Sequence, residues 1–229
     1  MPTHLRALFI GNSFTARNDV PALIAAIAES KGHTLSARLI SRGGASLRMH
    51  YNGRDALPAI QRGGGKFDTV ILQEQSTLPV KNAARMHESI RLFDAPIRAA
   101  GARMVLYLTW ARRHSPEAQA AITDAYTSIA RELGATVAPA GIAWEQVLKA
   151  HPQITLHDKD QSHPTPAGSY LAACTLFAVL FNESPLGAPA PSSLDPKQAD
   201  VLQKGAWHAA NAEQTKQQAK EKGGSSPAR

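Results

Sequence analysis

Cysteine is nearly absent from this sequence. The 229 residues contain one cysteine, Cys174, which lies within the apolar run Leu171–Phe177. A single thiol forms no disulfide bond within its own chain, so a fold held together by disulfides is excluded. The apolar neighbours of Cys174 indicate a buried helix position, where the thiol serves packing.

Long apolar runs are also missing. No stretch approaches the roughly 18 apolar residues of a membrane-spanning helix. The amino-terminal residues lead directly into a strand-like segment, Leu5–Ile10, without the apolar core and cleavage site of a signal peptide. We therefore expect no membrane insertion and a cytoplasmic location for the chain as given. If a leader has been removed, the expected location is periplasmic or secreted.

Aromatic residues make up only 6% of the chain, and they are not interleaved with its basic residues. The net charge is +7, and much of the excess lies in residues 1–63, where eight lysines and arginines accompany three acids. Four arginines recur there: Arg42, Arg48, Arg54 and Arg62. Without base-stacking aromatics this pattern argues against nucleic-acid binding, although it would suit an anionic substrate.

Motifs for cofactors are lacking as well. The glycine-rich segment Arg62–Lys66 has neither the preceding strand nor the Lys-Ser/Thr ending of a phosphate-binding loop. A cluster of histidines and carboxylates suggests a zinc hydrolase as an alternative, but its spacing matches no common metal motif; its members are His151, His157, Asp158, Asp160 and His163. We therefore expect no nucleotide cofactor and no metal ion, and the oligomeric state is left open.

The composition that is present, 43% hydrophobic and 19% charged, is typical of a globular protein with a packed core. At this length one domain is expected, over residues 1–220. Residues 221–229 are rich in glycine, serine and charge, which predicts a disordered tail.

Apolar runs of strand length alternate with longer segments of helical period, which predicts an α/β fold with parallel strands and crossover helices. The expected strands are Arg6–Ile10, Leu35–Ile40, Thr69–Leu72, Met104–Thr109 and Thr136–Ala138. The expected helices are Val20–Ser30, Lys81–Ala100, Pro116–Leu133, Pro166–Phe181 and Pro196–Lys220. In such a sheet the ligand site lies beyond the carboxyl ends of the strands.

A serine stands at that edge after the first strand, in Gly11–Thr15. Serine becomes a nucleophile when a base removes its proton and a carboxylate holds that base. Asp160 and His163 offer both groups just before the last long apolar helix. Proline after His163 favours extended backbone, so these two residues are expected on a taut loop. The prediction is a triad in which His163 is the base and Asp160 fixes its tautomer.

An oxyanion that forms during ester cleavage needs preorganised donors. The backbone amides of Ser13 and of Gly44, in the Gly43-Gly44 pair, are natural candidates, with a tight turn as the alternative role of the pair. Gln73 and Gln75 follow the third strand, and either side-chain amide would complete the hole. Trp110 follows the fourth strand and is a candidate substrate-binding residue, with core packing as the alternative.

These four segments, in this order, resemble the SGNH hydrolase superfamily of GDSL-type esterases and lipases. The resemblance implies a flavodoxin-like three-layer α/β/α sandwich with a five-stranded parallel sheet, Ser13 as nucleophile, and Asp160 and His163 as its partners. It also implies Gly44 and a third-segment side chain as oxyanion donors. Asn12 stands where the family usually has aspartate, and Gln73–Ser76 replaces the usual Gly-x-Asn-Asp.

The substrate is the least determined feature. Gln73 and Glu74 partly resemble the Gln-Gly-Glu segment of carbohydrate-deacetylating branches of the superfamily, which favours small acyl esters, acetyl above all, on a glycan or small molecule. A lysophospholipase or thioesterase is the alternative enzyme. The altered third segment also admits a non-catalytic carbohydrate-binding protein on the same scaffold.

Overall fold

The computed structural model describes residues 1–62 and 67–223, with side chains described for 1–61 and 67–215. The glycine-rich segment at 63–66 and tail residues 224–229, for which we made predictions above, lie outside the described residues. In the part of the chain that is described, every helix is too short or too polar to cross a membrane.

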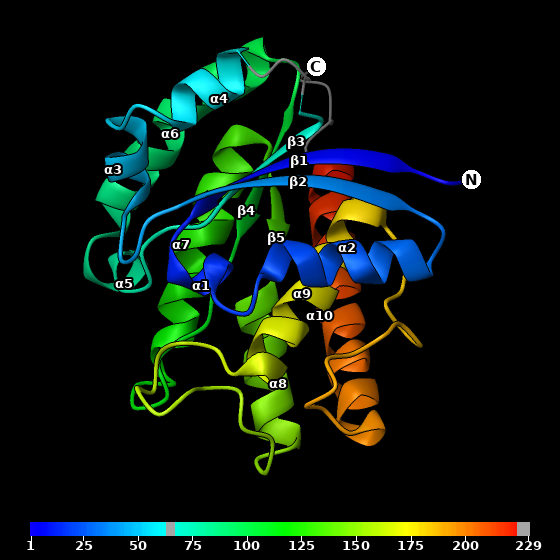
Figure 1. Ribbon diagram of the computed structural model, residues 1–229. Helices are drawn as coiled ribbons and strands as arrows, with labels where there is room; N and C mark the ends of the chain where they lie inside the picture. The colour runs from blue at the N-terminus through cyan, green and yellow to red at the C-terminus, as the bar shows by residue number, and fades with distance from the viewer. Residues whose placement is uncertain (63–66, 224–229) are drawn as a thin grey trace.

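Five parallel strands form one sheet (Figure 1). They are β1 (His4–Gly11), β2 (Thr34–Ser41), β3 (Thr69–Leu72), β4 (Arg103–Tyr107) and β5 (Thr136–Ala138). Their order is β2-β1-β3-β4-β5, and all four pairings are parallel. The chain leaves β1 in one direction to β2 and later returns to its other side as β3. The crevice expected at such a reversal lies beyond the ends of β1 and β3.

Helices cover both faces of the sheet and complete the expected three-layer α/β/α fold (Figure 1). They are α1 (Ser13–Ala16), α2 (Val20–Ser30), α3 (Leu47–Tyr51), α4 (Ala56–Arg62), α5 (Leu78–Lys81), α6 (Ala83–Ala99), α7 (Ala118–Leu133), α8 (Ala140–Ala150), α9 (Pro166–Phe181) and α10 (Pro196–Gly223). Alternate residues of β1 serve opposite faces. Ala7 and Phe9 pack in the core with α2, α8, α9 and α10, whereas Leu8 and Ile10 pack with α3, α4, α6 and α7.

The helix that follows the Asp160–His163 segment is the most buried one. Thr165 caps α9, and its Oγ1 accepts a hydrogen bond from the Gly168 amide at 3.2 Å, with Pro166 at the first helical position as predicted. Cys174 is fully buried in this helix, which confirms the expectation for its thiol. A helix buried on all sides gives the loop before it a firm base.

Several helical segments differ from the prediction, among them the short helices α1, α3, α4 and α5, which were not expected. Helix α8 was not expected, because Pro139 and Gly141 at its start indicate a turn. Gly141 is required there by packing, since a Cβ at this position would lie 2.0 Å from the Thr109 carbonyl oxygen. The helix expected from Lys81 is interrupted at Asn82, whose side chain caps α6 by accepting from the Arg85 amide. Helix α10 continues to Gly223, beyond the expected end.

Candidate active site

The proposed nucleophile lies in a sharp connection between β1 and α1. Gly11 ends the strand, and a Cβ there would lie 2.6 Å from the Gln73 side-chain oxygen, so a larger residue would displace Gln73 from its contacts with this segment. Asn12 then caps α1: its Oδ1 accepts from the Phe14 amide at 3.1 Å, while its Nδ2 donates to the Ala45 carbonyl at 3.1 Å. Ser13 is thereby fixed as the first residue of α1 at the carboxyl edge of the sheet.

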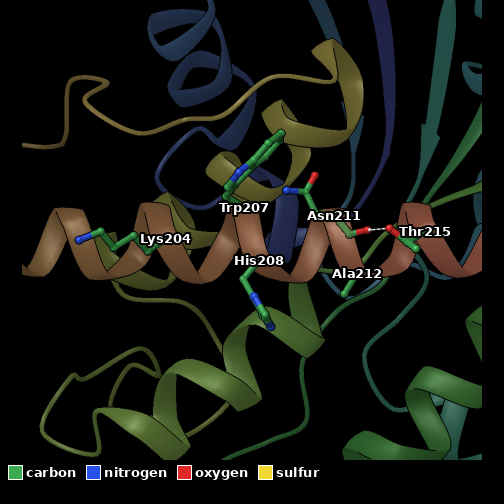
Figure 2. A pocket seen from close by; sticks show the side chains of 6 residues that line it. All are labelled: Lys204, Trp207, His208, Asn211, Ala212 and Thr215. Carbon is green, nitrogen blue, oxygen red and sulfur yellow. Dashed lines mark hydrogen bonds between the residues drawn. The ribbon is translucent and has the colours of Figure 1, made fainter.

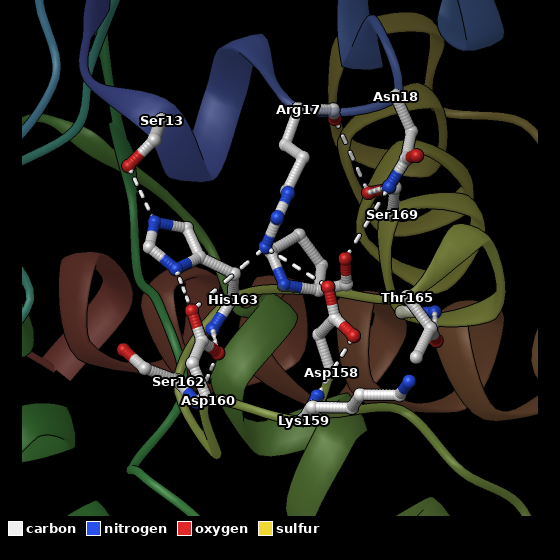
Figure 3. A network of polar contacts seen from close by, with 12 residues as sticks. Ser13, Arg17, Asn18, Asp158, Lys159, Asp160, Ser162, His163, Thr165 and Ser169 are labelled. Carbon is white, nitrogen blue, oxygen red and sulfur yellow. Dashed lines mark hydrogen bonds and ion pairs between the residues drawn. The ribbon is translucent and has the colours of Figure 1, made fainter.

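The three residues expected to act together are brought together. Ser13 Oγ lies 2.8 Å from Nε2 of His163, and Nδ1 of the same ring hydrogen-bonds the Asp160 carboxylate (Figure 3). With the ring proton on Nδ1, Nε2 is free to accept the serine proton. Segments 150 residues apart in the sequence thus form one continuous chain of hydrogen bonds.

Asp160 is held in its ionised form by its own loop. One carboxylate oxygen accepts from the amides of His163 at 2.9 Å and Ser162 at 3.0 Å, and the other accepts from the His163 ring. The backbone hydrogen bond from His163, followed by its side-chain hydrogen bond, holds the pKa of Asp160 well below its usual range. The carboxylate therefore stays charged while the imidazole gains and loses its proton.

The loop that carries Asp160 and His163 is tied down from several sides. Gln161 adopts a left-handed conformation with φ 60°, which bends the chain between the two residues. Arg17 forms an ion pair with Asp158 at 3.2 Å and lies 3.9 Å from Asp160 (Figure 3). The taut loop predicted from the sequence is therefore present, and Arg17 is a contributor that the sequence did not reveal.

Trp110 supports this loop from inside. Its Nε1 donates to the Ser162 carbonyl at 3.0 Å, and its ring stacks between Phe14, at 4.7 Å, and Trp144, at 3.8 Å. Only 1% of Trp110 is exposed. Both ring faces are covered by other aromatics, so Trp110 offers no platform to a ligand, and the packing alternative describes it correctly.

The expected oxyanion donors separate into two groups. In the described part of the chain, the backbone amides of Ser13 and Gly44 have no acceptor, and Gly44 lies in an exposed turn with φ 66°. Gln73 is 1% exposed and fully engaged: Oε1 accepts from the Asn12 amide at 2.9 Å and from the Thr15 hydroxyl, and Nε2 donates to the Glu74 carbonyl. Gln73 therefore braces the nucleophile segment from a buried position.

Gln75 differs from Gln73 in having an unused amide group. Its Oε1 accepts from the amides of Thr77 and Leu78 at the start of α5, which fixes the side chain. Its half-buried Nε2 has no hydrogen-bond partner among the described residues. Of the two glutamines considered, Gln75 is the more exposed one and the one whose side-chain amide nitrogen makes no hydrogen bond in the described residues.

Glu74, between them, was not among the site residues expected from the sequence, and the structure places it beside them. It is completely buried, and Oε1 accepts from the amides of Leu47 at 3.0 Å and Gln75 at 2.7 Å. Its Oε2 has no partner among the described residues, and burial raises the pKa of this carboxyl from 4.5 to about 7. Through one oxygen Glu74 joins the segment after Gly44 to the segment of Gln75.

Two buried histidines have structural contacts near the site. Nε2 of His50 donates to the Gly11 carbonyl at 2.6 Å, and Nε2 of His157 donates to the Ala111 carbonyl at 2.9 Å. Burial lowers the pKa of both rings. In the described ranges, no group of three or more His, Cys, Asp and Glu side chains is placed to share a metal ion.

A separate hollow of about 480 Å³ runs along α10 (Figure 2). It is lined by Lys204, Trp207, His208, Asn211, Ala212 and Thr215. All of these residues come from one helix, and none is a candidate site residue.

Comparisons with solved structures agree with the fold described above. No family model matches the chain, and no curated protein sequence matches it. Among solved structures, a protein of Slackia heliotrinireducens described as a candidate SGNH hydrolase is 28% identical, with a TM-score of 0.67, over 77% of this chain and 98% of that one. A DUF4886 family protein of Bacteroides uniformis is 22% identical, with a TM-score of 0.76, over 93% and 99%. An acetyl xylan esterase is 15% identical, with a TM-score of 0.58, over 76% and 98%.

Proposed function

We propose that this chain, which belongs to the SGNH hydrolase superfamily, is a serine esterase that cleaves small acyl esters through an acyl-enzyme on Ser13. The observation that carries the proposal is the hydrogen-bonded chain from Ser13 through His163 to Asp160. Without a base in contact, a serine hydroxyl is a weak nucleophile, and here the base and its orienting carboxylate are both in contact.

The reaction follows from the roles of these groups. His163 Nε2 removes the Ser13 proton as Oγ attacks the ester carbonyl carbon, and Asp160 stabilises the imidazolium that results. The amides of Ser13 and Gly44, together with Gln75 Nε2, donate to the oxyanion. The tetrahedral intermediate then collapses as His163 gives its proton to the leaving alcohol. A water molecule, deprotonated by His163, hydrolyses the acyl-enzyme by the same steps.

Acetyl groups on carbohydrates are the substrates we favour. The Gln73–Glu74 pair resembles the third segment of carbohydrate-deacetylating relatives, and an acetyl xylan esterase is among the proteins of the same fold. Fold similarity at this identity supports the scaffold only, so the acyl group and the alcohol are part of the proposal.

Activity-based labelling tests the nucleophile directly. A fluorophosphonate probe should modify the wild-type protein at Ser13, and an activated acetate ester should give a burst of product. Ser13→Ala should abolish both, whereas Ser128→Ala, which removes a half-buried hydroxyl that bonds the Asp124 carbonyl within α7, should leave both unchanged. Full activity in Ser13→Ala, or a label on another residue, would show that the triad assignment is wrong.

The same assay separates the alternatives. Activity that rises with acyl chain length would indicate a lysophospholipase or thioesterase. Tight glycan binding with neither turnover nor labelling would indicate a non-catalytic binding protein.

A further inference from the structure

A cavity of about 350 Å³ opens between α5 and the chain that follows β4. Its lining combines hydroxyl groups from Ser76 and Thr77, cationic or titratable groups from Lys81, Arg112 and His114, and an apolar floor that includes Ile122. A mixed lining of this kind suits a small polar ligand that carries a charge.

The walls of this cavity are formed by residues that neighbour, along the chain, residues of the candidate active site. Ser76 follows Gln75, the side chain with the free amide. Arg112 lies two residues after Trp110, whose ring stacks on Phe14 beside Ser13. Two residues of extended chain span at most about 7 Å. The Arg112 wall of the cavity is therefore at most this span along the chain from Trp110, whose ring packs against the residue next to Ser13.

The loop of Arg112 is also bonded to the loop that carries the base. The Arg113 amide donates to the Gln161 carbonyl at 2.9 Å, between Asp160 and His163. On its other side, Arg112 borders a second cavity, of about 320 Å³, with Arg113, Lys149 and His157 among its lining residues. Arg112 thus stands between two hollows next to the site.

The positive charge here lacks partners. In the described residues, neither Arg112 nor Lys81 has a carboxylate within ion-pair distance. The lining of the first cavity includes one acidic residue, Glu117, beside these two cations. The Nε atom of Arg112 is buried with no hydrogen-bond acceptor in the same part of the chain. A buried donor without an acceptor is unfavourable, so the Arg112 guanidinium keeps unmet hydrogen-bonding capacity beside the cavity that it lines.

We propose that Arg112, with Lys81 and His114, forms a subsite for an anionic group on the ester substrate. This inference rests on the proposed esterase function and narrows its substrate class to acylated acidic sugars. The guanidinium fork binds a carboxylate or a phosphate through paired, charge-assisted hydrogen bonds, and the Ser76 and Thr77 hydroxyls suit neighbouring sugar hydroxyls. The anion is either the carboxylate of a uronic acid or the phosphate of a sugar phosphate.

Three matched substrates test the subsite and distinguish the two sources. They are a mono-O-acetylated methyl glucoside, the corresponding glucuronide, and the corresponding 6-phosphate. The wild-type protein should show a higher kcat/KM for an anionic substrate than for the neutral one, and the ratio should fall at high salt. Preference for the glucuronide or for the phosphate identifies the anion.

Arg112→Met keeps the length of the side chain and removes its charge. It should lower kcat/KM for the preferred anionic substrate by roughly 10- to 100-fold, as expected for a charge-assisted hydrogen bond, and leave the neutral substrate nearly unchanged. Arg112→Lys should restore part of the loss. Arg131→Met is the matched control, because Arg131 is exposed on α7, about 20 Å along the helix from Ala118 at the cavity.

An equal loss on neutral and anionic substrates in Arg112→Met, or no anionic preference in the wild-type protein, would overturn the subsite. Neither result would affect the esterase proposal, which stands on labelling of Ser13 and on cleavage of the neutral ester. If Arg112→Met fails to fold by circular dichroism, Lys81→Met provides the same comparison from the opposite wall.

Discussion

Replacing Glu74 with glutamine should change how the stability of the protein depends on pH. The Glu74 carboxyl is fully buried, and burial raises its pKa from 4.5 to about 7. Between these two values the folded protein keeps a proton that the unfolded chain releases. The free energy of unfolding therefore falls as pH rises through this window, and the contribution is lost above the folded pKa.

The magnitude follows from the two pKa values. A pKa difference of one corresponds to about 1.4 kcal/mol, so a change from 4.5 to about 7 corresponds to about 3 kcal/mol of stability lost between pH 4.5 and pH 8. Glutamine keeps the oxygen that accepts from Leu47 and Gln75 and cannot ionise. The Glu74→Gln protein should therefore lack this part of the pH dependence.

Urea unfolding at constant ionic strength, at pH 4.5 and at pH 8, measures the effect. Buried His50 and His157 have lowered pKa values, so their contribution increases stability as pH rises. Because both proteins contain these histidines, the difference between the wild-type and variant profiles isolates Glu74. Parallel profiles would mean that the carboxyl does not change its protonation on folding and would refute the reasoning.

Two further substitutions test the roles of neighbouring side chains. Gln75→Glu keeps the oxygen that caps α5 and removes the side-chain amide donor. The value of kcat should therefore fall by roughly 10²- to 10³-fold with little change in stability. An unchanged kcat would show that Gln75 is not part of the oxyanion hole. Asp160→Asn places an amide against Nδ1 of His163 and favours the wrong ring tautomer. The value of kcat should fall by roughly 10³- to 10⁴-fold, and fluorophosphonate labelling of Ser13 should slow in parallel. A loss of kcat under tenfold would argue against the orienting role of Asp160.

The residues of the expected triad could be identified from the sequence because the patterns that mark them are local. A serine directly after a strand, and an aspartate three residues before a histidine at a capped helix, are visible without any long-range information. The alternation of apolar runs was sufficient for the sheet, and the structure confirms the five strands to within a few residues. Roles that depend on which side chains meet across the sheet were not accessible in this way.

Gln73, Glu74 and Trp110 illustrate that limit. Gln73 and Gln75 have the same chemistry and lie two positions apart. Their roles differ because Gln73 contacts Asn12, 61 residues away in the sequence, and so braces the nucleophile segment. Glu74 is an acid, a residue type that is mostly exposed, and its burial depends on amides supplied by Leu47 and Gln75. The packing of Trp110 depends on Trp144, from a helix that the sequence did not indicate.

The stacked aromatic rings beside the site also provide an intrinsic spectroscopic probe of its conformation. Two of the three tryptophans, Trp110 and Trp144, lie with ring centroids 3.8 Å apart and planes 9° from parallel, and Trp110 is bonded to the loop that carries His163. Rings in this arrangement couple electronically, and they contribute a near-ultraviolet circular dichroism signal that is lost when the stack opens. Any displacement of that loop, by a ligand or a substitution, is therefore readable from intrinsic absorption and fluorescence, without an attached dye.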